Sequence, residues 1–506
     1  MKKKTKSTKL NNILIILVLI SSIFLIYNIL LLGPIEKTIR YIIIGIILFI
    51  NFLFFKTKQT KNQNIAILMM ILFIIVNIIC SFGINKIYSL IDSINKNKIV
   101  YSSSLIALKK SNINTIDDVT KAKIGIINDN LSVDNYIIAK EIIEDEKLDK
   151  DNEIVKYDDI LNMLNDLYNK KIDLMFISSN YPIMFQDIES YENIKNDVKV
   201  ITTKDKTIKK QSNSFSFNNN GNIKPFSILL MGVDSEKDGL KKNAYANGDG
   251  LMILTFNPDT LNITMMSIPR DSYLPIACRD NKENKLTHAG WFGTDCMINT
   301  ISNAFNIDIN YYLKINFKGV VALVNNLGGV TVDVPKDLCT DDSNRTNEVC
   351  IKKGIQTLDG EGALVLARNR HDLALGDIGR GYNQQLLIKA IINKFAEVRD
   401  VNTIMKLLET ISNNLDTNLS TNEILSFYNI FKDVIESKKQ GSTNDLLNII
   451  QIKLKGEGKT IYFKQYNSNM WSYLLDDNSI KEATKEMKIN LGSEEPELIK
   501  EFKFKP

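Results

Sequence analysis

Three long runs of hydrophobic residues open the chain. They are Ile13–Leu32, Tyr41–Phe55 and Ile65–Ile84. The first and third approach the roughly 20 apolar residues that a helix needs to cross a bilayer. The second is shorter, but Arg40 and Lys56 flank it and can extend their charges to the two interfaces. The first run is too long for the apolar part of a cleaved signal peptide. The pattern therefore predicts three transmembrane helices, which form a membrane anchor over residues 1–92.

The next hundred residues alternate between strand-like and helix-like patterns. Ile124–Ile127 and Ile172–Ile177 are short apolar runs typical of buried strands. Asp134–Glu146 and Asp159–Asn169 are predicted helices, and the second repeats its apolar residues with a helical period. The alternation predicts a small α/β lobe with a parallel or mixed sheet over residues 97–203.

A polar stretch and a second α/β region follow. Residues 204–224 are rich in Asn, Ser, Lys and Gly, which predicts a linker. Predicted strands after it are Ser227–Met231, Gly250–Phe256, Ile263–Ile268, Tyr311–Ile315 and Val330–Val334. Predicted helices are Cys296–Phe305, Phe317–Leu327, Glu361–Ala367 and Tyr382–Val398. The pattern predicts a layered α/β domain with a central sheet over residues 225–492, and a tail over residues 493–506.

The distribution of charge predicts the membrane orientation. Lysines precede the first apolar run and lie between the second and third: Lys2, Lys3, Lys4, Lys6, Lys9, Lys56, Lys58 and Lys61. The loop between the first two runs carries only Lys37 and Arg40, offset by Glu36. The positive-inside rule then predicts a multi-pass protein of the cell membrane whose bulk, after about Asn85, lies outside the cytoplasm. The net charge is only +5, and we find no basic helix with interleaved aromatic residues, so we expect no nucleic-acid partner.

The cysteines agree with an extracytoplasmic location. Cys278, Cys296, Cys339 and Cys350 are an even number in a compartment where disulfides persist. Four cysteines allow three connectivities, and we favour the local pairs, Cys278 with Cys296 and Cys339 with Cys350. No CxxC motif occurs. The two histidines, His288 and His371, are far apart in the sequence, so a cysteine–histidine metal site is not expected.

Arginines and carboxylates recur across Gly232–Gln385. The carboxylates are Asp234, Asp249, Asp271 and Asp377, and the arginines are Arg270, Arg368, Arg370 and Arg380. Guanidinium groups that share a site repel one another unless an anion holds them, and their planar forks suit phosphate oxygens. Carboxylates in the same site need a divalent cation beside the anion. The set predicts a magnesium-bound phosphate or diphosphate, and therefore phosphoryl transfer.

Short motifs around these residues occur in a characteristic order. They include Leu230-Met231-Gly232-Val233-Asp234, Asn247-Gly248-Asp249, Ser267-Ile268-Pro269-Arg270-Asp271, Leu358-Asp359-Gly360, Arg368-Asn369-Arg370 and Gln384-Gln385. Each motif is weak alone, but the ordered series is specific. From Ser227 to about Lys394 the chain resembles the LytR-CpsA-Psr family of bacterial cell-wall enzymes.

The resemblance implies a layered α-β-α catalytic domain with a mixed central sheet. It implies transfer of a polyprenyl-(di)phosphate-linked glycopolymer, teichoic-acid-like or capsular, onto peptidoglycan, with Mg²⁺ or alternatively Mn²⁺ as the cofactor. At the matching positions, Asp234 and Asp249 would bind the metal. The implied catalytic residues are these two together with Arg270, Arg368 and Arg370. The implied diphosphate-binding residues are Arg270, Lys285, Arg368, Arg370, Arg380 and Gln384.

Two positions depart from the family pattern and keep alternatives open. The family usually has an arginine where Asn247 stands and another where Asn383 stands. Each charge-assisted bond to phosphate is worth ~1.5–3 kcal/mol, so the loss of two guanidinium groups is expected to weaken turnover or rearrange the acceptor site. The alternatives are a polyprenyl-diphosphate hydrolase that uses water as acceptor, and a lipid-diphosphate binding module without turnover.

The lobe carries a looser resemblance. Ile116–Ile126 and the segment from Met163 to Leu174 resemble one lobe of the extracellular solute-binding proteins. The lobe has no catalytic constellation. We therefore favour a structural or spacer role over a ligand sensor coupled to the membrane helices.

Overall fold

The computed structural model describes most of the chain, as two compact units. The described residues are 2–33, 37–56, 63–94, 98–130, 132–185, 188, 190–209, 224–233, 248, 250–340, 348–370, 372–373, 376–398, 400–427, 448–463, 468–495 and 498–499. The first unit comprises Met1–Asn95, Ile404–Ser412 and Leu419–Leu446, and the second comprises Lys96–Thr403, Asn413–Asn418 and Leu447–Pro506. Each unit is described separately.

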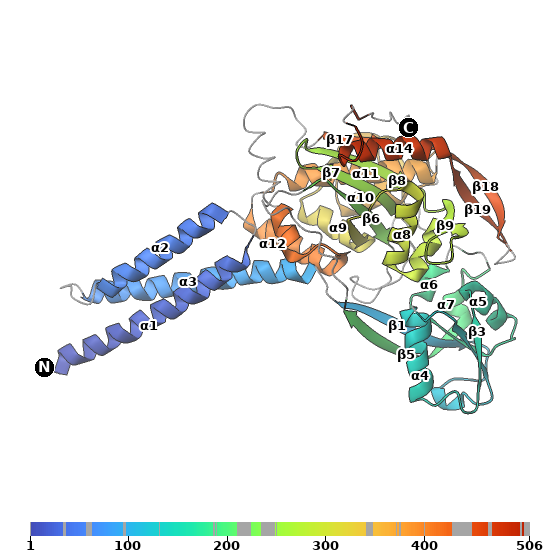
Figure 1. The fold of residues 1–506 in the computed structure, drawn as a ribbon, viewed down its shortest axis with the longest axis horizontal. Coiled ribbons are helices and arrows are strands. Elements are labelled where there is room, and N and C mark those ends of the chain that lie inside the picture. The colour runs from blue at the N-terminus through green and yellow to red at the C-terminus, as the bar shows by residue number, and fades with distance from the viewer. Residues whose placement is uncertain are drawn as a thin grey trace. The chain divides into compact units, whose positions relative to one another are not determined.

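Three apolar helices dominate the first unit (Figure 1). They are α1 (Lys2–Leu31), α2 (Lys37–Lys56) and α3 (Gln63–Ile94). All three are long and apolar enough to cross a membrane, which confirms the predicted anchor helices. The few polar side chains on them pair with each other: Asn77 Nδ2 lies 3.1 Å from Ser21 Oγ and 3.0 Å from Ser22 Oγ. Such pairing satisfies polar groups that lipid cannot hydrate.

The first unit also contains segments from far along the chain. Ile404–Ser412, within α12 (Val401–Asn414), clusters with the N-terminal helices, as does the segment that begins at Leu419. The Thr421 hydroxyl donates to Asp92 Oδ1 at 2.8 Å. We predicted one domain over residues 225–492, and these segments of it contact the N-terminal helices, a long-range contact that leaves no local pattern in the sequence.

The lobe in the second unit is built on a five-stranded mixed sheet. Its strands are β1 (Lys98–Leu108), β2 (Lys123–Ile127), β3 (Glu153–Tyr157), β4 (Leu174–Ser178) and β5 (Val198–Lys209), in the order β3-β2-β4-β1-β5. Strand β2 runs parallel to β3 and β4, whereas β1 is antiparallel to β4 and β5. Helices α4 (Ile138–Asp145) and α5 (Ile160–Tyr168) pack into different core clusters of this sheet.

Part of the predicted linker belongs to this lobe. Asp205 pairs with Ser102 and Lys209 pairs with Lys98, so the start of the predicted linker at residue 204 was wrong. The polar composition misled us because β5 is a long strand on the edge of the sheet, where side chains need not be apolar. Residues 210–223 lie outside the described residues.

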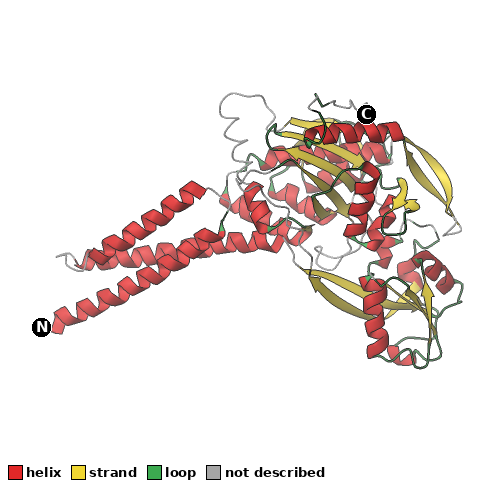
Figure 2. Cartoon of the chain, viewed as in Figure 1, coloured by secondary structure: helices red, strands yellow, loops and turns green. Residues whose placement is uncertain are grey.

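A six-stranded mixed sheet forms the centre of the larger domain (Figure 2). Its strands are β16 (Leu415–Thr417), β11 (Tyr311–Asn316), β6 (Phe226–Val233), β7 (Gly250–Asn257), β8 (Asn262–Ile268) and β17 (Asn448–Ile452), in that order. Helices α8 (Thr294–Phe305) and α14 (Asp477–Asn490) share one apolar core with β6, β7 and β8. Helix α11 (Asp377–Phe395) contacts β7 and β8, with α9 (Phe317–Asn326) and α10 (Gly360–Arg368) beside it. The predicted layered fold with a mixed sheet is confirmed.

Small antiparallel ribbons surround the central sheet. They are β9 (Tyr273–Ile276) with β10 (Lys282–Lys285), β12 (Val330–Val334) with β15 (Gly354–Leu358), β13 (Leu338–Cys339) with β14 (Cys350–Ile351), and β18 (Gly456–Phe463) with β19 (Ser468–Leu475). Both favoured disulfides are present, Cys278–Cys296 and Cys339–Cys350. The predicted strand Val330–Val334 forms, but it pairs with β15 and lies outside the central sheet.

Candidate active site

One edge of the central sheet collects the ends of its strands. Strands β6, β8, β11 and β17 run in the same direction and end there at Val233, Ile268, Asn316 and Ile452. Strand β7 runs the opposite way and begins there, with Gly250 paired to Gly232. The carboxyl ends of parallel strands are the usual location of ligand sites in open α/β sheets. Three of the predicted site residues, Asp234, Asp249 and Arg270, lie within two residues of these strand ends in the sequence.

Arg270 lies in a compact charged group just after β8. Its backbone N–H donates to Asp377 Oδ2 at 3.2 Å, and its Nε lies 3.8 Å from Asp271 Oδ2. Lys285 Nζ contacts the other oxygen of Asp271 at 3.0 Å. Asp377 also forms an ion pair with Arg380, one turn further along α11. The side chains of all five residues are at most 15% exposed, so these charges interact with little screening by water.

His288 lies beside this group and is kept neutral. Burial lowers its pKa well below the usual value, and the nearby charges of Lys285 and Arg270 lower it further. Its Nδ1 lies 2.8 Å from Asn284 Oδ1, which can only accept, so Nδ1 carries the proton. The imidazole stacks on Trp291, with ring centroids 3.9 Å apart. Both side chains are buried, as expected for packing residues.

The first turns of α11 are fixed onto β8 by Ser267. The Ser267 hydroxyl donates to the Gly381 carbonyl at 3.0 Å and accepts from Gln385 Nε2 at 3.0 Å. A Cβ on Gly381 would lie 2.8 Å from Ser267 Cβ, so only glycine allows this approach. The predicted helix start at Tyr382 was five residues late, because Gly379 and Gly381 interrupt the hydrophobic period in the first turn.

Gln384 joins α11 to two other parts of the site. Its Nε2 donates to the Ala367 carbonyl at 3.1 Å, at the end of α10. A Cβ on Gly250 would lie 3.1 Å from the same Nε2 atom. The amide therefore lies over the start of β7 and next to the segment that carries Arg368.

The Arg368-Asn369-Arg370 segment is held by the central asparagine. The Arg368 guanidinium carbon lies 4.6 Å from the centroid of the Phe317 ring, which begins α9 just after β11. Asn369 is 2% exposed, and its Nδ2 donates to the Cys339 carbonyl at 2.8 Å and to Asp372 Oδ2 at 2.7 Å. The disulfide of Cys339 thus braces the segment that bears both arginines.

Several predicted residues lie outside the described residues. They are Asp234, Asn247, Asp249 and His371. Asp234 follows Val233, the last residue of β6, and Asp249 precedes Gly250, the first residue of β7. Asn383 is described and is 1% exposed. No hydrogen-bond partner for its side-chain oxygen or nitrogen occurs in the part of the chain that the structure describes.

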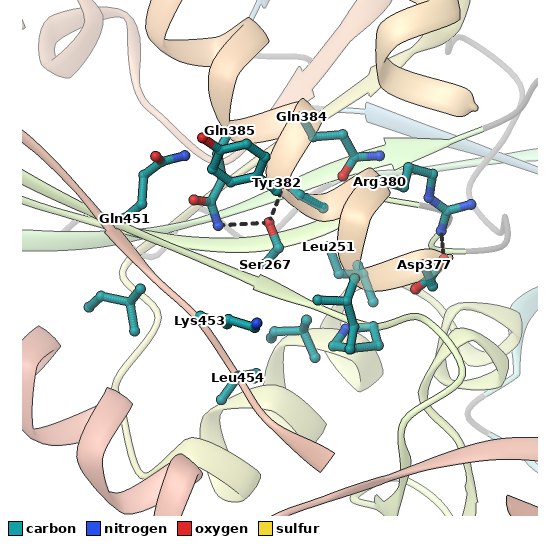
Figure 3. A pocket seen from close by; sticks show the side chains of 15 residues that line it. Leu251, Ser267, Asp377, Arg380, Tyr382, Gln384, Gln385, Gln451, Lys453 and Leu454 are labelled. Atoms are coloured by element: carbon teal, nitrogen blue, oxygen red, sulfur yellow. Dashed lines mark hydrogen bonds and ion pairs between the residues drawn. The ribbon is translucent and has the colours of Figure 1, made fainter. Parts of the chain in front are cut away.

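A pocket of about 520 Å³, partly open to solvent, lies at the same edge (Figure 3). It lies between the start of α11 and the ends of β8 and β17. Arg380, Asp377 and Gln384 line it together with Tyr382 and Lys453. The pocket therefore joins part of the charged group to a wall that includes a further cation, Lys453.

Sequence reasoning missed the residues that orient the arginines. Ser267 and Asn369 stand inside motifs that we quoted, but their hydrogen bonds depend on tertiary contacts. Phe317 is a residue of the helix that we predicted, and its ring underlies Arg368. Lys453 follows β17, an edge strand that we did not predict.

Comparison with known proteins identifies relatives of this region of the chain. The TagU polyisoprenyl-teichoic acid–peptidoglycan teichoic acid transferase of Bacillus licheniformis is 33% identical over 272 residues, 54% of this chain and 79% of that protein. TagU of Bacillus subtilis is also 33% identical, over 53% of this chain and 78% of that protein. An uncharacterized Staphylococcus aureus protein is 33% identical over 253 residues, which are 48% of this chain and 61% of that protein. The crystal structure of B. subtilis TagV is 27% identical, with a TM-score of 0.43 over 53% of this chain and 98% of that one.

The family model covers the domain that carries the site. It matches residues 188–489, more than half of the chain. The match includes every arginine and aspartate of the candidate active site. The chain belongs to the LytR_cpsA_psr family.

Proposed function

We propose that this protein is a membrane-anchored phosphotransferase that moves a polyprenyl-(di)phosphate-linked glycopolymer of the teichoic-acid class onto peptidoglycan. The collection of Arg270, Arg380 and the Arg368–Arg370 segment at one edge of the sheet carries the proposal. The names of the 33%-identical relatives, which are teichoic acid transferases, support it. A cluster of guanidinium groups suits a diphosphate, and phosphoryl transfer depends mainly on positioning and charge stabilisation.

In the proposed reaction, a sugar hydroxyl of peptidoglycan attacks the phosphorus that carries the glycopolymer. A new P–O bond forms, and the bond to the polyprenyl phosphate breaks. The polyprenyl phosphate leaves with the bonding electron pair, and the hydroxyl proton passes to a base. Arg270, Arg368 and Arg370 hold the diphosphate oxygens as negative charge shifts toward the leaving phosphate. Asp377 orients Arg270 and Arg380 through the contacts described above.

We propose Mg²⁺ as the cofactor, bound by Asp234 and Asp249. Each carboxylate is adjacent in sequence to a residue of the paired ends of β6 and β7, where Gly232 pairs with Gly250. That pairing brings the two chain segments to the same edge, and two carboxylates are a suitable donor set for a hard divalent cation. A bound Mg²⁺ would neutralise the charge of the diphosphate. Mn²⁺ is an alternative with the same ligand preference.

We propose that the second unit lies outside the cytoplasm. The three apolar helices and the lysines on the predicted inner side support this orientation. Two disulfides in the second unit suit an oxidising compartment. Cleavage of intact cells by an external protease, detected with an antibody to the C-terminal region, tests the orientation. Full protection of that region in intact cells would contradict it.

The test of the function uses the full-length protein in nanodiscs with a polyprenyl-diphosphate glycan and peptidoglycan oligosaccharides. Mass spectrometry should detect a phosphodiester conjugate with wild type, and none with Arg368→Ala or Arg370→Ala. Lys352→Ala is the matched control, because Lys352 forms an exposed surface pair with Asp337. Chelation of divalent cations should stop conjugate formation if Mg²⁺ is required.

The products separate the proposed function from its alternatives. Lipid cleavage without a conjugate would indicate a hydrolase. Donor binding without any product would indicate a binding module. Equal turnover in wild type and both arginine variants would contradict the assignment of the site.

A further inference from the structure

The β18–β19 ribbon has two faces of different character. The strands are antiparallel, with Thr460 opposite Trp471 and Tyr462 opposite Asn469, and opposed residues share a face. One face, which we name the aromatic face, consists of Gly458, Thr460, Tyr462, Asn469, Trp471 and Tyr473. On the other face, Phe463 is 1% exposed and its ring meets that of Tyr273 at 5.3 Å. The ribbon is therefore anchored at Phe463 on one face and at the buried Tyr473 on the other, and the rest of the aromatic face is exposed.

Large aromatic rings remain accessible on the aromatic face. Trp471 is 48% exposed and Tyr462 is 55% exposed. The indole of Trp471 lies across Gly458, since a Cβ there would be 2.8 Å from Trp471 Cζ2. A glycine at this position lets the ring lie against the ribbon, so one surface of the indole is available to a ligand. Exposed aromatic residues grouped in this way are typical of binding surfaces.

The polar groups on this face indicate what the ligand is. None of its residues carries a charge, since Lys459 and Glu457 belong to the opposite face. A polyanion such as single-stranded nucleic acid would require cations beside the rings. A pyranose ring has an apolar C–H surface that stacks on an aromatic ring and hydroxyl groups around its rim. Thr460 and Asn469 can hydrogen-bond to such hydroxyls.

The ribbon is continuous with the candidate active site. The Tyr473 backbone N–H donates to the Asp271 carbonyl at 2.9 Å, and Ser272 forms a parallel bridge with Tyr473. The Asp271 carboxylate contacts Arg270 and Lys285, as described above. Trp471 is two residues from Tyr473, roughly 7 Å along an extended strand. A ligand on the aromatic face therefore lies within a few sugar rings of the proposed diphosphate site.

We propose that the aromatic face binds the acceptor glycan strand, a neutral β-1,4-linked chain of N-acetylhexosamines, by stacking its rings on Trp471 and Tyr462. The proposal rests on the proposed function, because that function makes a peptidoglycan hydroxyl the acceptor. The strand would lie along the ribbon and present a hydroxyl near Arg270. The residues act by positioning the acceptor, so they should affect its KM more than kcat.

The test uses intrinsic fluorescence of the full-length protein in nanodiscs. The chain has two tryptophans, and Trp291 is buried at 2% exposure. The Trp291→Phe variant therefore reports on Trp471 alone. Chitohexaose, a soluble β-1,4 N-acetylglucosamine chain, should shift the Trp471 emission to shorter wavelength with saturation. In the conjugation assay, Trp471→Ala with Tyr462→Ala should raise the acceptor KM about tenfold, the effect of losing one or two stacking contacts. Ile355→Ala, at 78% exposure, is the matched control.

The outcomes separate this proposal from the proposed function. An unchanged acceptor KM in the double variant, together with no emission shift, would overturn it. A shift caused by phospholipid vesicles, or by raising protein concentration, but not by chitohexaose would assign the face to a membrane or a second copy and also overturn it. A saturable chitohexaose shift in a protein that forms no conjugate would support the aromatic face and refute only the transferase. Retention of donor binding by the double variant shows that it is folded.

Discussion

Among residues that do not contact the substrate, Asn369 is the one whose substitution we expect to lower turnover most. Its Nδ2 makes two hydrogen bonds, to Cys339 and Asp372, and its Oδ1 accepts from the Asp372 backbone N–H at 3.3 Å. Asn369→Ala removes all three of these partly buried hydrogen bonds. At ~0.5–1.5 kcal/mol for each net hydrogen bond, the segment loses about 2–4 kcal/mol of its preference for the native conformation.

This loss should appear in turnover because Arg368 and Arg370 flank the asparagine. If the two arginines occupy their native orientation less often by this amount, kcat should fall by roughly thirty- to a thousandfold, since each 1.36 kcal/mol corresponds to a factor of ten. The assay is conjugate formation at saturating donor and acceptor, with thermal unfolding measured in parallel. Donor KM should rise as well, because the same arginines bind the donor.

Asn418→Ala is the matched control. Asn418 Nδ2 donates to the Asn310 carbonyl at 3.0 Å, and its Oδ1 accepts from the Tyr312 N–H at 2.8 Å. These contacts lie beside the start of β11, at the end opposite to the candidate site. Asn418→Ala should therefore lower the melting temperature with little change in kcat. If the two variants lose the same stability and have equal kcat, the proposed role of Asn369 in positioning the arginines is refuted.

Three further predictions concern a buried carboxyl group, a disulfide and a close glycine contact. Burial raises the pKa of Asp134 in the lobe to about 7 from 3.8. Between about pH 4 and pH 7, the folded lobe keeps this carboxyl group protonated, whereas the unfolded chain ionises it. The free energy of unfolding should therefore decline by ~4 kcal/mol over this range. Urea unfolding of the Asp134→Asn variant should lack this decline. If the variant and the wild type show the same dependence of unfolding free energy on pH, this prediction is contradicted. Replacing Cys339 and Cys350 together by serine should lower the stability measured by thermal unfolding by ~2–3 kcal/mol. It should also reduce turnover, because the Arg368–Arg370 segment loses its support. Unchanged kinetics would show that the disulfide does not support the arginines. Gly381→Ala places a Cβ 2.8 Å from Ser267 Cβ and should cost ~1–3 kcal/mol by overpacking; an unaltered melting temperature would show that α11 adjusts freely.

Local sequence patterns predicted the main strands of the central sheet and the helices beside it, because each strand or helix repeats its apolar residues with a characteristic period. The apolar runs of β6, β7 and β8 and the helical period of α8 and α9 are visible in 8–12 residues of sequence. The edge strands β5 and β17 were not identified. Strand β5 alternates with many polar residues, as an edge strand can. Strand β17 buries Ile449, Ile450 and Ile452, but its run of five residues is too short to distinguish a strand from other buried segments. The start of α11 was misplaced because glycines needed for contact with β8 removed the hydrophobic signal.

The candidate site, too, could be predicted only in part from local sequence. The order of motifs predicts Arg270, Arg368, Arg370 and Arg380 as functional residues, but nothing in their spacing indicates which carboxylate each one contacts. Asp377 connects Arg270 to Arg380 only because α11 packs across the end of β8. The aromatic face likewise depends on the register of two strands, which aligns Trp471 opposite Thr460.

The sequence by itself determined the chemical groups, their order and the local periods from which strands and helices form. The three apolar helices and the layered α/β domain follow from these alone, as does the prediction that the site binds an anion. Only the tertiary structure decided that the parallel strands end at one edge and bring distant residues together there. The physical reason is that periodicity is a property of neighbours in the chain, whereas a site depends on which strands pair and in which direction, and many residues contribute to that choice at once.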